Sequence, residues 1–87
     1  MINVKYDVEA DAAYIRLSER PVQQTREESD VCIVDLDESG QVAAIELLSV
    51  FGFAGASLHE LVRKGLISGE SAWQALNELR SGLLAPA

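Results

Sequence analysis

Cysteine and histidine are scarce in this chain of 87 residues, which contains one of each. A single cysteine, Cys32, excludes an internal disulfide, and its place inside an apolar run is typical of a small buried hydrophobe. A single histidine, His59, excludes the zinc sites that are built from several histidines. We therefore expect a protein of a reducing compartment, the cytoplasm, and no metal or other cofactor.

Basic residues are also few: seven Lys and Arg side chains stand against 14 Asp and Glu, which gives a formal net charge of −7. The resulting field repels phosphate groups, so binding to nucleic acids or anionic membranes is disfavoured. A basic protein partner is permitted, because complementary charge speeds encounter. No apolar run approaches the roughly 18 residues of a membrane span, and the first residues lack the apolar core of a signal peptide.

The length limits the size of the core. A chain of this length is expected to form a single domain over residues 1–87 and to bury only about 60–65% of its unfolded surface. The 48% hydrophobic content supports one core, but not a core that also encloses a large ligand cavity. Because association with a second copy would enlarge this small core, we expect a homodimer.

Residues 31–48 predict a β-hairpin, since two apolar runs flank an acidic turn that ends at Gly40. Gly40 can adopt the left-handed conformation that a short hairpin loop demands. Asp37 and Ser39 can hydrogen-bond their own backbone and stabilise the bend. The register then follows from burial, because a slip of one residue would turn the apolar side chains outward.

A second hairpin is predicted upstream, where apolar and polar residues alternate over residues 2–6 and 13–17 around the acidic turn 7–11. Residues 2–50 are therefore expected to form the sheet region, an antiparallel meander of about four strands in two hairpins. Segment 22–26 fits an edge strand or a plain loop, and the pattern does not choose between them.

An uncharged, glycine-spaced stretch follows the sheet region, and we interpret residues 51–56 as an apolar linker. Its two aromatic side chains, Phe51 and Phe53, either plug one end of the sheet core or form a self-association surface. After the linker, Ser57 and Glu60 have the spacing of a capping box, in which each side chain satisfies a free helix amide.

Two C-terminal helices are predicted within residues 57–82, the first over about 58–64 and the second over about 70–80. Gly65 is placed as the left-handed stop of the first helix. The second helix carries an apolar stripe of Ala72, Trp73, Leu76 and Leu79. Because Arg80 is its only basic residue, a DNA-reading helix-turn-helix is disfavoured. We expect an α+β fold in which this helical hairpin packs on the sheet or on a second protomer.

Few residues suggest chemistry. Asp7, Glu9 and Asp11 alternate like the start of a calcium loop, but Ala12 and Ser18 occupy the positions of the required glycine and glutamate. With Arg16, these acids form the alternative interpretation, a domain that binds a small ligand or a divalent metal. A Cys32–His59 nucleophilic pair is a third possibility, although a strand core does not activate a thiol. We expect the protein not to be an enzyme.

A family resemblance is carried by four segments: YDVEADAAYIRL at 6–17, TRE at 25–27, IVDLDESGQV at 33–42 and IELL at 45–48. In order and spacing they resemble the prokaryotic family called domain of unknown function 2283, over roughly residues 2–50. Ala13 and Ala43 are smaller than the aliphatic residues usual there. The resemblance implies a scaffold without known catalytic residues. Family members resemble antitoxin-like partners, being small, acidic and often encoded next to small toxins.

The function that we expect is non-catalytic protein binding, with an acidic surface offered to a basic partner such as a small toxin. Aromatic and aliphatic anchors dominate interfaces of this kind. The residues predicted to lie at a protomer or partner contact are Phe51, Phe53, Trp73, Leu76 and Leu79.

Overall fold

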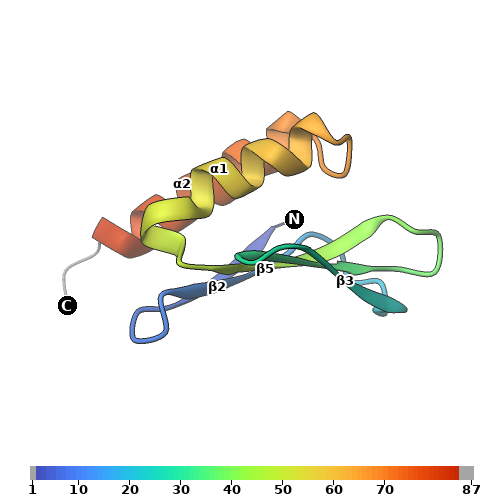
Figure 1. The fold of residues 1–87 in the computed structure, drawn as a ribbon, viewed down its shortest axis with the longest axis horizontal. Coiled ribbons are helices and arrows are strands. Elements are labelled where there is room, and N and C mark those ends of the chain that lie inside the picture. Colours follow the sequence, from blue (N-terminus) through green and yellow to red (C-terminus); the bar gives the residue numbers. More distant parts are fainter. Residues whose placement is uncertain (1, 85–87) are drawn as a thin grey trace.

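The structure, a computed structural model, describes residues 2–84 and the side chains of residues 2–82. It is an α+β fold of two layers, in which one five-stranded antiparallel sheet carries two helices on a single face (Figure 1). The predicted fold class is confirmed. Neither helix in this part of the chain has the length and apolar content that crossing a membrane requires.

The strand order corrects the expected meander. The strands are β1 (Asn3–Asp7), β2 (Ala12–Arg16), β3 (Gln24–Ser29), β4 (Cys32–Leu36) and β5 (Val42–Leu48). Their spatial order is β1-β2-β5-β4-β3. β5 therefore lies in the centre, between β2 and β4, and not at an edge after β4. The physical reason lies in composition: β5 buries four of its seven residues, including Ala43 and Ala44 on opposite faces, and a strand with neighbours on both sides is where longer side chains can cover such small residues.

The segment left open between edge strand and loop is a strand. β3 pairs with β4 and forms the outer edge of the sheet, which brings the count to five strands where about four were expected. The pairing is irregular between Glu27 and Ser29. Glu28, at this irregularity, is bound by Lys64 at the end of the first helix, with 3.1 Å between Nζ and Oε1. This ion pair ties the edge strand to the helix layer.

The core lies between the sheet and the helices. Strand residues that alternate along β2, β4 and β5 point to the helix layer, while their neighbours point to solvent. The largest fully buried side chains are Ile15, Val34, Ile45, Leu47, Leu58, Leu61 and Leu79. The predicted hairpin of residues 31–48 is therefore confirmed, with Val34 opposite Ile45. Gly40 has the expected positive φ of 85°.

The helix boundaries differ from the predicted ones at the start of the layer. α1 spans Val50–Arg63, so residues 51–56 are helical and the predicted linker is wrong. Ser57 is buried inside the helix and does not begin it. Gly65 does follow the helix with a φ of 76°. α2 spans Gly69–Leu84, and the hydroxyl of Ser68 accepts the Ser71 amide at 3.0 Å as its cap.

Candidate interaction surface

The start of α1 is held by an aspartate from the β1–β2 turn. The Asp11 carbonyl oxygen accepts the Val50 amide at 3.0 Å, and its carboxylate Oδ1 accepts the Phe51 amide at 3.1 Å and the Tyr6 hydroxyl at 2.7 Å. A negative charge at a helix N-terminus satisfies free amides and interacts favourably with the helix dipole. Because this cap lies 40 residues away in sequence, local pattern reasoning placed the helix start at Ser57 instead.

Three aromatic side chains on the helix layer face solvent. Phe51 is 82% exposed, Phe53 53% and Trp73 63%. We call these residues, with Gly52, Gly55 and Ala56 between them, the aromatic face. Phe51 and Phe53 do not plug the sheet core, which corrects that interpretation. The helix layer therefore exposes three large aromatic groups to solvent.

The small residues of the aromatic face lie on the side of α1 that points away from the sheet. Buried residues of the helix are Val50, Ala54, Ser57, Leu58 and Leu61. At the helical repeat, Gly52, Gly55 and Ala56 fall opposite these positions, with Phe51 and Phe53 on either side. A Cβ atom added at Gly52 or Gly55 would meet nothing within 4 Å. No contact within the chain therefore requires these glycines.

A groove of about 270 Å³ runs between α1 and α2 beside the aromatic face. Phe51 and Trp73 line it, together with the small Ala54 and Gly55. Of the predicted interface residues, Leu76 is half-buried in this groove, whereas Leu79 is only 2% exposed and belongs to the chain's own core. Arg80 is the single charged residue among those that line the groove.

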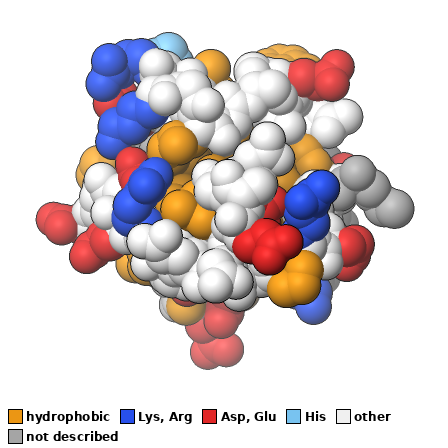
Figure 2. Space-filling view, turned by 90° about the vertical axis from the view of Figure 1, so that its right-hand side faces the viewer, with side chains coloured by type: hydrophobic (Ala, Val, Ile, Leu, Met, Phe, Trp, Pro, Cys, Tyr) orange, Lys and Arg blue, Asp and Glu red, His pale blue; other side chains and the backbone are white. Residues whose placement is uncertain are grey.

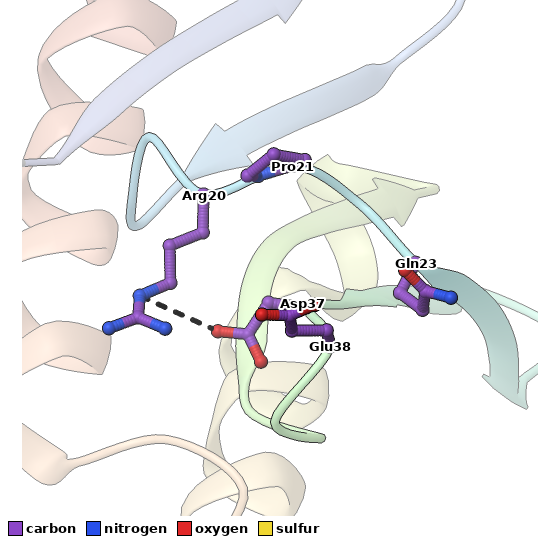
Figure 3. A pocket seen from close by; sticks show the side chains of 5 residues that line it. All are labelled: Arg20, Pro21, Gln23, Asp37 and Glu38. Atoms are coloured by element: carbon purple, nitrogen blue, oxygen red, sulfur yellow. Dashed lines mark ion pairs between the residues drawn. The ribbon is translucent and has the colours of Figure 1, made fainter.

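A smaller pocket of about 140 Å³ belongs to the β4–β5 turn (Figure 3). Asp37 lies in it with 4% exposure, and its Oδ1 accepts the Ser39 hydroxyl at 2.6 Å and the Gln41 amide at 3.0 Å. Arg20 approaches Oδ2 to 3.9 Å. These contacts, the Ser39 hydroxyl first, lower the pKa of the Asp37 carboxyl. The Asp37 carboxylate thus stabilises the β4–β5 turn, as the sequence predicted for Asp37 and Ser39.

The acidic residues of the alternative, metal-binding interpretation do not converge. Asp7 accepts the amides of Glu9 and Ala10 at 3.0 and 3.2 Å, and Asp11 caps α1. Arg16 donates to the Arg20 carbonyl oxygen at 3.3 Å. Within residues 2–82, no three acidic, His or Cys side chains are grouped so as to hold a metal ion. On the face seen in Figure 2, acidic side chains are scattered over the surface and interspersed with basic ones.

The Cys32–His59 pair is separated by the helix layer. Cys32 lies in the core with 2% exposure, and burial raises the pKa of its thiol to about 11. His59 is exposed on α1, one turn beyond Ala56 on the outward side. In Figure 2 the histidine lies next to a group of basic side chains at the upper edge. A thiol with this pKa is protonated at neutral pH and is a poor nucleophile.

The uncovered face of the sheet carries a satisfied polar network. Asp35 accepts the Tyr14 hydroxyl at 2.9 Å and the Thr25 hydroxyl at 2.8 Å, one on each oxygen. Burial and the bond to Asp35 raise the pKa of Tyr14. Ala44 is fully buried on this face, in the strand between Tyr14 and Asp35. This face is therefore polar, unlike the aromatic face.

Sequence reasoning missed two features of the helices. The first is the small-residue stripe of α1, whose spacing of three and four was readable but was interpreted as a linker. The second is a groove between α2 and the sheet that is lined by Glu70, Gln74, Asn77 and Glu78. Their spacing along α2 is also helical, but only the fold shows that the sheet edge lies opposite them.

Comparison with known proteins identifies the sheet region. No curated protein and no solved structure matches the chain. One family model, described as protein of unknown function, matches residues 3–50, which is more than half of the chain. The matched region holds all five strands and ends where α1 begins. The resemblance predicted over roughly residues 2–50 is thereby confirmed, and the chain belongs to the family of proteins of unknown function DUF2283.

Proposed function

We propose that this protein is a non-catalytic protein-interaction module that works as a homodimer through its aromatic face. The observation that supports the proposal is the exposure of three large aromatic side chains, Phe51, Phe53 and Trp73, on the helix layer. Large aromatic groups are the usual anchors of protein interfaces. The buried Cys32 and the dispersed acids agree with a role that involves no chemistry.

A second copy of the chain is the occupant that best fits this surface. A two-fold interface brings the same patch of two protomers together, so the patch must complement itself. The aromatic face offers both projections, Phe51 and Trp73, and openings, Gly52 and Gly55. It is also nearly uncharged, since no charged residue occurs from Ser49 to Leu58. The net charge of −7 therefore opposes close approach only weakly at this face.

Two glycines within α1 support the same conclusion. A glycine in a helix interior lowers helix stability by about 0.8–1.0 kcal/mol relative to alanine. Neither Gly52 nor Gly55 has a positive φ or a neighbour that excludes a Cβ atom. Small residues allow the backbones of two helices to approach closely. Close packing of a second helix against this side of α1 would use the space that both glycines leave open.

We extend the proposal to an antitoxin-like role in the cytoplasm, in which the dimer presents its acidic remainder to a small basic protein. The supporting observation is charge. The chain has 14 acidic and seven basic side chains, and no residue of the aromatic face is charged. Opposite charge favours encounter with a basic partner and disfavours acidic ones. Co-purification with the product of the adjacent reading frame, at moderate salt, tests this extension.

A dilution series by multi-angle light scattering tests the dimer. The wild type should change from twice the monomer mass to the monomer mass on dilution. Trp73→Ala should weaken association about 30-fold, the equivalent of the roughly 2 kcal/mol of an interface hot spot. Val8→Ala is the matched control, because Val8 is 74% exposed and lies outside the face. A wild type that stays monomeric at millimolar concentration contradicts the proposal.

A further inference from the structure

The two edges of the sheet differ in how they meet solvent. The β3 edge is irregular between Glu27 and Ser29, and Glu28 is bound by both Arg26 and Lys64. Charges and irregular pairing are the devices by which natural sheets block the addition of another strand. The β1 edge carries the charges of Lys5 and Asp7, but its pairing with β2 is regular, in unbroken register from Asn3 opposite Arg16 to Asp7 opposite Ala12.

A groove of about 650 Å³ lies between α2 and the end of the β1–β2 hairpin. Ile2 and Leu17, both half-buried, form its apolar floor, next to the first residue of β1 and the last of β2. The exposed carboxylates of Glu70 and Glu78 on α2 border it. No Lys or Arg lines this cavity, and within residues 2–82 neither glutamate forms an ion pair.

From these observations we propose that the β1 edge binds an extended basic segment of another protein as a sixth strand, with its basic side chains under α2. Backbone groups of β1 supply the hydrogen bonds of strand addition, and the groove selects the side chains. Lysine or arginine is selected because the stem can cover Ile2 and Leu17 while the cation reaches a glutamate. The inference names the chemistry of the proposed basic partner, but it does not depend on dimerisation.

The distance between the two glutamates constrains where basic residues occur in the added strand. Glu70 and Glu78 are eight residues apart on α2, which corresponds to about 12 Å along the helix axis. Two residues four apart on a β-strand lie on the same face and are separated by about 13 Å. Basic residues at positions i and i+4 of the added strand therefore match the two carboxylates. Residues i+1 and i+3 face the polar side of the sheet, beside Lys5 of β1.

The probe is the end-blocked peptide Lys-Val-Thr-Val-Lys, which is titrated into the full chain while amide hydrogen exchange is followed by NMR. We expect saturable binding and added protection at those alternate amides of Asn3–Asp7 that do not bond β2, with no change along β3. The double variant Glu70→Gln/Glu78→Gln should weaken binding by roughly 3- to 10-fold, as the loss of two exposed ion pairs predicts. The double variant Glu38→Gln/Glu46→Gln removes the same charge elsewhere and should leave the affinity unchanged.

Three results would overturn the inference: no saturable binding to the folded wild type, equal affinity of both double variants, or binding without protection of β1. Circular dichroism of each variant confirms that the fold is retained. The peptide should bind Trp73→Ala as tightly as wild type, because Trp73 does not line this groove. Failure of the dimer and failure of the strand site are therefore separate outcomes, read by light scattering and by hydrogen exchange.

Discussion

Replacing Gly55 with alanine should stabilise the isolated chain and weaken its self-association. Gly55 lies inside α1, and an added Cβ atom has nothing within 4 Å. The substitution therefore gains the full helix propensity of alanine, about 0.8–1.0 kcal/mol, without a clash in the protomer. For a domain of this size, that gain raises the melting temperature by about 4–8 °C. The measurement is a thermal melt at a concentration where light scattering finds only monomer.

The same methyl group should have the opposite effect on the dimer. At a two-fold contact each protomer contributes one extra methyl group, and overpacking of a close contact costs about 1–3 kcal/mol, or roughly 5- to 150-fold in Kd. Gly69→Ala is the matched control. Gly69 is the first residue of α2, at the end of the helix layer away from the start of α1, also with open space at its Cβ, and it does not line the groove. The control should leave the Kd of the dimer unchanged.

A separate result would contradict each of the two effects predicted for Gly55→Ala. A Gly55→Ala chain that is more stable but dimerises with unchanged Kd would mean that no helix packs on this side of α1. A chain that is less stable as a monomer would mean that the space around Gly55 is filled. Opposite signs in the two measurements are hard to obtain from a general loss of folding, because misfolding lowers both stability and association.

Further predictions concern single residues of the scaffold. Asp11→Ala removes the cap of α1 and should lower the free energy of unfolding in urea by about 0.5–2 kcal/mol, whereas Asp11→Asn, which keeps an acceptor, should lose less. Because the folded state lowers the pKa of Asp37, its contribution is complete above the ordinary aspartate pKa of about 3.9 and disappears as the pH falls below it. Asp37→Asn should thus be less stable than wild type at pH 7 but equally stable near pH 2, in melts followed by circular dichroism. The Cys32 thiol, with its pKa near 11, should react with a disulfide reagent at pH 7 only as fast as the chain unfolds, so an immediate reaction would contradict its burial. Leu79→Ala should cost about 2–5 kcal/mol in urea unfolding, because Leu79 is 2% exposed; a smaller loss would place it outside the core.

Part of the candidate surface could be predicted from sequence. The sequence predicts Phe51, Phe53 and Trp73 at a contact because aromatic anchors dominate protein interfaces, and all three are exposed in the fold. Leu79 was assigned to the same contact but is buried in the protomer. Periodicity places a residue on the apolar side of a helix, but it does not say whether that side meets the sheet or another molecule.

The sequence by itself determined the hairpin of residues 31–48, the left-handed turns at Gly40 and Gly65 and the family, because each depends on residues close together in the chain. The tertiary structure alone decided the strand order, the start of α1 at Val50 and the groove beside β1. β5 is central because its small residues are buried on both faces between neighbouring strands, and α1 begins early because Asp11 accepts its first amides across the fold. Contacts between distant segments leave no periodic signal in either segment, so only the folded chain shows them.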